Sequence, residues 1–199
     1  MQRSGLSRIL PIALILVVIA VAVAGLFSLG QSMFGGDTQS GISLNEGEEA
    51  LTRTENGSGV RMTVRGEIVG NGEFNSYTIT IRPTYRNMTT YVGYEKQIVE
   101  RRELNNNKEA YEQLVYALQR LNYMSATPFE GERNDTRGIC ATGLLYEFEV
   151  LRDNRSVQKL WTTSCDDSGS FDANLTRVRE LFQDQIPDMY KLLRGIDLS

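Results

Sequence analysis

The side chains that carry most hydrolytic and proton-transfer chemistry are scarce in this chain. Its 199 residues include no histidine and only two cysteines. Without histidine there is no Ser-His-Asp or Cys-His nucleophile system, no histidine-ligated zinc, and none of the side chain best suited to proton transfer at neutral pH. We therefore expect no catalytic residue, no cofactor and no metal site, and the composition favours a protein that is not an enzyme.

Three motifs resemble catalytic or metal-binding patterns only weakly. Ser156 and Lys159 have the S-x-x-K spacing of penicillin-binding proteins, but they fall on an expected strand, which points them to opposite faces. The segment 166–172 contains three aspartates without the ligand order of an EF-hand, and an acidic turn before a helix is the simpler interpretation. Glycoside hydrolysis requires a pair of carboxylates, and the candidates for it are Glu67, Glu147 and Glu149. Alternating acids on a strand usually form its solvated side.

The two cysteines are spaced as a disulfide across a hairpin. Cys140 and Cys165 are equidistant from the expected turn between strands 144–150 and 157–163, so their side chains are expected to lie opposite each other. Closing this loop would stabilise the domain by about 3 to 4 kcal/mol in the chain-entropy model. A reactive or metal-binding pair and two free buried thiols are the alternatives.

The pattern of apolar residues predicts the elements that position these side chains. Alternation predicts strands at 60–65 and 77–82, joined through the turn at Gly70-Asn-Gly72, and one or two further strands at 88–99. Helices are expected from a cap at 105–107 to about 122 and from a cap at Asp172 to 186, with a separate final turn at 189–194 after Pro187. The order ββ(β)α-ββα predicts an α+β fold, in which an antiparallel sheet carries two helices packed on one face.

An apolar segment precedes this domain. Residues 9–29 include 18 apolar residues in 21 and no charge, and as a helix they would span about 31 Å, the thickness of a bilayer core. A cleaved signal peptide is the alternative, because 22–24 has the small-x-small pattern of a cleavage site. We expect an uncleaved single-pass transmembrane anchor within 1–30. Arg3 and Arg8 place its N-terminus in the cytoplasm and the remaining chain outside the cell membrane.

The segment after the anchor has the composition of a tether. Residues 31–59 are rich in Gly, Ser, Thr and acids, which predicts a flexible extracytoplasmic linker before a domain at 60–199, although a short helix at 46–52 is an open alternative. Without residues 1–30 the chain has 19 basic and 25 acidic side chains, a net charge of −6. An acidic domain argues against nucleic acid as its partner.

Five of the 12 asparagines lie in N-x-S/T sequons. They indicate either a glycosylated ectodomain or a polar surface rich in Asn, Ser and Thr. The five are Asn56, Asn87, Asn134, Asn154 and Asn174.

Four segments carry a resemblance to a group of bacterial proteins. They are 137–143 (RGICATG), 146–150 (YEFEV), 159–165 (KLWTTSC) and 185–188 (QIPD). In these segments the chain is similar to uncharacterised single-pass membrane-anchored proteins of ultrasmall candidate-phylum bacteria, a group with no assigned activity. The resemblance covers residue 60 to the C-terminus.

The order of the elements carries a second, topological resemblance. Two strands, a helix, a hairpin and a helix are similar to emfourin-type inhibitors of secreted metalloproteases. This resemblance implies a protease-inhibitor-like domain. The cysteine-bridged hairpin departs from the usual emfourin pattern, and no inhibitory residue is transferred.

These observations give three hypotheses for function. The first is a membrane-anchored extracytoplasmic binding module without catalytic activity, whose partner is an unidentified extracytoplasmic protein or envelope ligand. The second is the protease-inhibitor-like domain. The third is an enzyme that uses carboxylates in a cleft, for which the carboxyl groups would need a raised pKa.

Overall fold

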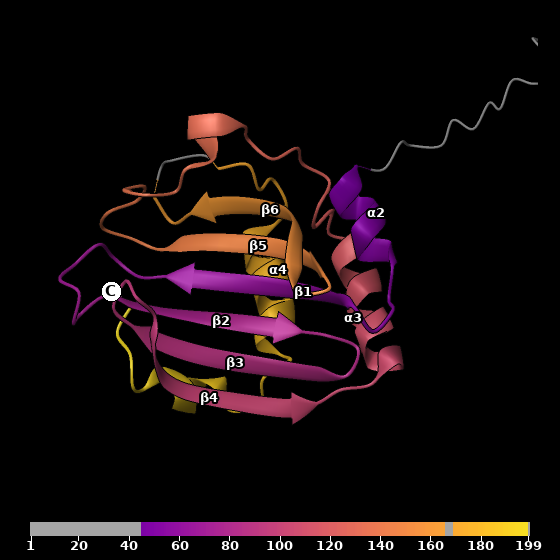
Figure 1. Ribbon diagram of the computed structural model, residues 1–199, viewed down its shortest axis with the longest axis horizontal. Helices are drawn as coiled ribbons and strands as arrows, with labels where there is room; N and C mark the ends of the chain where they lie inside the picture. Colours follow the sequence, from indigo (N-terminus) through magenta and orange to yellow (C-terminus); the bar gives the residue numbers. More distant parts are fainter. Residues whose placement is uncertain (1–44, 166–168, 199) are drawn as a thin grey trace, which may run out of the picture. The chain divides into compact units, whose positions relative to one another are not determined.

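The computed structural model of the protein describes residues 45–165 and 169–198. Along these residues a short helix is followed by four strands, a helix, two more strands and two helices (Figure 1). In chain order the elements are α2 (Glu46–Thr52), β1 (Ser58–Arg65), β2 (Asn75–Ile81), β3 (Tyr85–Val92), β4 (Gln97–Asn105), α3 (Lys108–Gln119), a 3-10 turn (Gly131–Asn134), β5 (Leu145–Arg152), β6 (Arg155–Thr163), α4 (Leu175–Gln183) and α5 (Met189–Leu193).

The six strands form one sheet in the order β4-β3-β2-β1-β5-β6, and every neighbouring pair is antiparallel. Figure 1 shows α4 behind the sheet and α3 beside the ends of the strands, next to α2. The expected α+β class and antiparallel sheet are confirmed, and the segment 88–99 contributes to two strands, β3 and β4. Strand β1 therefore lies inside the sheet, between β2 and β5.

Alternate residues of the strands build the core on the helix side. Because successive side chains point to opposite faces of a strand, every second residue of β1, β2 and β5 is apolar and faces the helices. These side chains pack with the apolar stripes of α3 and α4 in one cluster. Among its most buried members are Val60, Met62, Ile79, Ile81, Phe148, Tyr111, Leu118, Val178 and Phe182.

The two long helices begin at asparagine caps. Asn107 Oδ1 accepts the backbone N–H of Ala110 at 2.8 Å at the start of α3, within the expected cap at 105–107. The cap expected at Asp172 was wrong: Asn174 caps α4 and accepts the N–H of Arg177 at 3.0 Å. The backbone N–H of Phe171 donates to Trp161 O at 2.9 Å, which holds the chain along the edge of β6 until after that residue.

The expected linker at 31–59 needs a correction for the residues that the structure describes. Residues 45–59 are folded: the helix left open at 46–52 is confirmed as α2, which buries Ala50 and Leu51 in the core, and β1 begins at Ser58. Gln158 of β6 fixes α2, since its Oε1 accepts the N–H of Gly47 at 3.0 Å. Composition predicted a tether because three of the helix's seven residues are glutamates, but its two buried apolar residues suffice to dock it. Residues 31–44 lie outside the described residues.

The turn at 70–72 also differs in its setting. Glu73 donates its N–H to Gly70 O at 2.9 Å, so a turn is present, but it lies within a loop at 66–74 instead of joining the strands directly. The loop is held by the segment before β5, where Ala141 O accepts the N–H of Ile68.

The expected transmembrane anchor at 9–29 lies outside the described residues. In 45–165 and 169–198, none of the helices has both the length and the apolar character needed to cross a membrane.

Candidate functional site

The face of the sheet opposite the helices is polar. The strand pairing arranges its side chains in three rows that cross the sheet from β6 to β4. The rows are Lys159, Glu149, Arg61, Thr80, Asn87 and Glu103; then Trp161, Glu147, Thr63, Thr78, Thr89 and Arg101; then Thr163, Leu145, Arg65, Ser76, Tyr91 and Ile98. We call this surface the open face.

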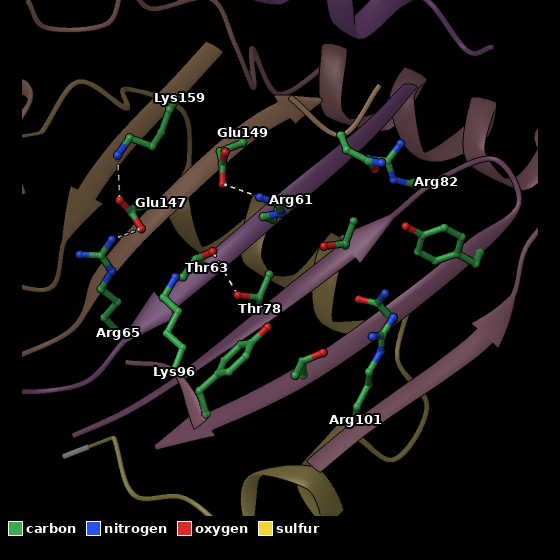
Figure 2. A pocket seen from close by; sticks show the side chains of 16 residues that line it. Arg61, Thr63, Arg65, Thr78, Arg82, Lys96, Arg101, Glu147, Glu149 and Lys159 are labelled. Atoms are coloured by element: carbon green, nitrogen blue, oxygen red, sulfur yellow. Dashed lines mark hydrogen bonds and ion pairs between the residues drawn. The ribbon is translucent and has the colours of Figure 1, made fainter. Parts of the chain in front are cut away.

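The open face is hollowed, with a cavity volume of about 490 Å³ (Figure 2). Short threonine and asparagine side chains lie in the middle of the sheet, and longer charged side chains surround them. Six of the lining residues are cations and two are carboxylates, a net charge of +4 in a chain whose net charge is −4. The cations are Arg61, Arg65, Arg82, Lys96, Arg101 and Lys159, and the carboxylates are Glu147 and Glu149.

Both carboxylates are held by neighbouring cations. Glu147 is only 5% exposed and accepts from Arg65 Nη2 at 2.7 Å and from Lys159 Nζ at 3.0 Å. Glu149 Oε1 lies 3.5 Å from Arg61 Nη1. The expectation that the alternating acids of this strand form its solvated side was therefore wrong. Long cationic side chains from β1 and β6 cover the acids, and the acids in turn orient the cations.

Arg82 is a buried cation at the end of the hollow nearest the β5–β6 turn. Its side chain is 5% exposed and donates to Gly57 O at 3.1 Å and to Asn154 Oδ1 at 2.7 Å. A Cβ on Gly59 would lie 3.0 Å from Arg82 Cγ, so glycine leaves the space that this side chain fills. Within the described parts of the chain, no carboxylate lies at ion-pair distance from Arg82. Its charge is thus left to act on the hollow.

A row of hydroxyl groups crosses the floor of the hollow. Thr63 Oγ1 lies 3.3 Å from Thr78 Oγ1, and Thr78 faces Thr89 on the next strand. Thr63 and Thr89 are buried, since longer neighbours rise beside them. Hydroxyls donate and accept, so this floor can bind either the hydroxyl or the anionic groups of a ligand.

Three of the asparagines in sequons have structural roles. Asn87 lies in the open face and is 9% exposed, Asn154 binds Arg82, and Asn174 caps α4. These roles support the interpretation of the sequons as part of a polar surface.

The cysteine pair lies beside the third row of the open face. Cys140 and Cys165 are at disulfide distance, S–S 2.00 Å, as the spacing predicted, with their Cα atoms 5.6 Å apart. Their bond joins the loop before β5 to the end of β6. The next residue of that loop, Ala141, accepts the N–H of Ile68 at 2.8 Å, so the bridge also anchors the loop at 66–74.

The structure does not bring the other candidate residues together. Lys159 binds Glu147, whereas Ser156 Oγ donates to Gln158 O at 3.4 Å. Glu67 lies in the 66–74 loop and does not line the hollow with Glu147 and Glu149. The segment 166–172 includes three residues outside the described part, and among the described residues no group of three or more potential metal ligands occurs.

Part of the open face leaves a signal in the sequence. Arg61 and Arg65 alternate with apolar residues on β1, and Glu147 and Glu149 do the same on β5. What was missing was the order of the strands, because β1 and β5 are far apart in the chain and adjacent only in the sheet. Lys96 and Arg82 lie in or beside turns, where alternation gives no signal.

No family model matches the chain, and no curated protein matches its sequence. The resemblances to the candidate-phylum proteins and to emfourin-type inhibitors therefore stay predictions.

Proposed function

We propose that the domain is a non-catalytic binding module that holds an acidic polysaccharide on the open face of its sheet. The observation that carries this proposal is the charge of the hollow: six cations line it against two carboxylates, which are held by Arg61, Arg65 and Lys159. One further acid of the open face, Glu103, pairs with Arg101 and leaves the surface with an excess of cations. The excess positive charge stands out because the chain as a whole is acidic. Positive potential concentrated in a hollow attracts an anionic ligand to it.

The spread of the cations favours a polymer over a small anion. Arg61 and Arg65 are four residues apart on β1, a separation of about 13 Å along the strand. From Lys159 on β6 to Arg101 on β4 the sheet advances five strands, about 24 Å. One carboxylate or phosphate cannot span these distances, whereas an extended chain with repeated charges can.

The polar groups between the cations favour a polysaccharide over a nucleic acid. Single-stranded nucleic acids are held largely by stacking on several aromatic side chains. The hollow offers two tyrosines, Tyr85 and Tyr91, among many hydroxyl and amide groups. Sugar hydroxyls pair with threonine and asparagine, and uronic acid carboxylates pair with arginine and lysine. The membrane anchor expected at 9–29 would place the module outside the cell, where acidic envelope polymers occur.

The test is a binding titration of the full chain with polygalacturonate, with neutral dextran and with a single-stranded oligothymidylate. We expect polygalacturonate to bind tightest, dextran not to bind, and affinity to fall steeply with salt. The double variant Arg61→Gln/Lys159→Gln should lose about tenfold or more in affinity. Its affinity should also depend less steeply on salt, because binding through fewer cations releases fewer counterions.

The matched control is Arg53→Gln/Lys191→Gln, which removes the same charge from side chains that do not line the open face. An equal loss in both double variants would show that only net charge matters and would refute a site on the sheet. Tighter binding of oligothymidylate than of polygalacturonate would show that the ligand is a nucleic acid and not a polysaccharide. The absence of binding to either polyanion would refute the proposal.

A further inference from the structure

A second hollow lies beside the open face and differs from it in character. Its volume is about 390 Å³, within the range of small-molecule sites. Three segments form its walls: the loop at 66–74, the turn between β3 and β4, and the loop at 136–139. Its apolar lining residues are Ile68, Phe74, Tyr94, Ile139 and Leu145.

One wall is a stacked pair of aromatic rings. The rings of Phe74 and Tyr94 have centroids 4.2 Å apart and an interplanar angle of 12°. Tyr94 is 49% exposed, and its hydroxyl donates to Val69 O at 2.9 Å, which fixes the ring on the loop. Ile68, 44% exposed, completes the apolar surface. Exposed apolar groups gathered in a concave site are typical of a binding surface.

The charged residues of this hollow are all cations. Arg65, Lys96 and Arg137 line it, and no acid does. Arg137 donates to both carboxylate oxygens of Asp135, which lowers the pKa of Asp135 to about 2 and gives Arg137 a counterion. Lys96 forms no ion pair with any described residue, so its charge is left for a ligand. Arg65 is paired with Glu147 through Nη2, and its Nε is the group that remains to donate. Figure 2 shows both at the same end of the open face, and they line both hollows.

Two hydrogen-bonding groups in the wall lack partners. Ser76 is 1% exposed, and its hydroxyl makes no hydrogen bond with the residues described; the same holds for Arg65 Nε. The two residues are neighbours across β1 and β2. Buried polar groups are normally paired, so two unpaired ones in one wall point to a missing acceptor.

Lys96 has a backbone conformation that a lysine seldom adopts. Its φ is 57°, in the left-handed region where glycine and asparagine are favoured. Asparagine would fit the turn at lower cost, so the backbone does not explain the lysine. The side chain of Lys96 lines both hollows, where its charge can act on a ligand.

We propose that this second hollow is a binding site for a small amphiphilic monoanion, a molecule with one aromatic body and one carboxylate. The aromatic body lies between Ile68 and the Phe74–Tyr94 pair, and the carboxylate accepts from Lys96 and Arg65. This site goes beyond the polysaccharide site, which does not require the apolar walls.

The test is calorimetric titration of the full chain with 1-naphthylacetate, acetate and 1-naphthylmethylamine. We expect 1-naphthylacetate to bind at least tenfold tighter than acetate, which lacks the ring, and than the amine, which lacks the negative charge. Ile68→Ser should weaken this binding about tenfold and leave polygalacturonate binding unchanged. The control Val99→Ser changes an exposed valine of β4 that lies outside the open face and lines neither hollow, and it should have no effect.

The charge is tested with Lys96→Asn, which suits the backbone and removes the cation. We expect the same or higher thermal stability and a five- to tenfold loss in 1-naphthylacetate affinity, while Lys108→Asn on α3 leaves the affinity unchanged. If 1-naphthylacetate binds no tighter than acetate, or if Ile68→Ser and Lys96→Asn bind it as the unchanged chain does, the site is refuted. Polygalacturonate binding by Ile68→Ser separates this failure from failure of the open face.

Discussion

Arg65 Nη2 donates to Glu147 Oε2 over 2.7 Å, across the central pair of strands β1 and β5. Glu147 lies diagonally opposite Arg65 and accepts from Lys159 on its other oxygen. One buried carboxylate thus holds a cation on either side of it, and one of these, Arg65, belongs to both hollows. The acid organises the positive face at the cost of reducing its charge.

Replacement of Glu147 should move stability and affinity in opposite directions. Glu147→Gln leaves Arg65 and Lys159 without their counterion, so we expect a loss of about 1 to 3 kcal/mol in the free energy of unfolding. The open face gains positive charge, and polygalacturonate affinity should rise severalfold. Urea denaturation and a binding titration measure the two effects. Glu112→Gln, on α3, is the control that should not raise affinity; a fall in affinity for Glu147→Gln would show that the carboxylate itself binds ligand.

The space above Gly59 should be essential for Arg82. In Gly59→Ala the new Cβ would lie 3.0 Å from Arg82 Cγ and 3.3 Å from Ile81 O, which forces the arginine or the strand to move. We expect a loss of about 1 to 3 kcal/mol in stability by denaturation, typical of overpacking. Gly72→Ala is the matched control, since a Cβ there has nothing within 4 Å. Equal stability of the two variants would mean that Arg82 is not confined as described.

Removal of the disulfide should affect stability and the second hollow together. Cys140→Ala/Cys165→Ala opens a loop with a sequence separation of 25, and we expect a loss of about 3 to 4 kcal/mol in stability. Because the bridge anchors the loop that bonds to Ile68, 1-naphthylacetate affinity should fall as well, with little change for polygalacturonate. Denaturation with and without reductant, followed by both titrations, gives the answer. Unchanged 1-naphthylacetate affinity would show that the wall does not depend on the bridge.

The buried tyrosines should set the alkaline limit of the fold. Burial raises the pKa of Tyr77 from 10.0 to about 12, and it also raises the pKa values of Tyr111 and Tyr123. Below pH 10 these phenols are protonated in both states, and their contribution to stability is complete. As the pH rises from 10 through 12, tyrosines of the unfolded chain ionise first, and that stability is lost.

We expect part of the nine tyrosines to resist ionisation past pH 10 and then to ionise together with the loss of the circular dichroism signal. Absorbance at 295 nm follows ionisation, and Tyr77→Phe should move the transition to higher pH. Ionisation of all nine near pH 10 with the dichroism intact would contradict the burial of these side chains.

The sequence predicted the parts of the fold that depend on local pattern. Alternation at Val60, Met62 and Val64, and the helical stripe from Tyr111 to Leu118, identified strands and a helix because one face of each is buried. Asp172 was mistaken for a cap because contacts with β6, invisible in the local sequence, delay the start of α4. The docking of α2 was missed for the same reason, since Gln158 lies 111 residues from Gly47.

The disulfide was predictable, but the open face was not identified. The cysteines are symmetric about one turn, so spacing alone placed them. The cationic hollow combines residues of all six strands with three turns, and only the strand order brings Arg61 beside Glu149 or Arg82 over Gly59. The charged side chains that alternate with apolar ones on β1 and β5 are expected to be solvated when each strand is considered alone. No single strand shows that these side chains share one surface.

The most direct measurement of the central claim is a map of backbone amide chemical shifts during titration of the full chain with polygalacturonate. Binding on the open face predicts the largest shift changes at Arg61, Thr63, Thr78 and Thr89. The amide shifts of α3 should stay as they are in the free chain. Changes confined to the helices, or the absence of changes along β1 and β2 at saturating polymer, would contradict it.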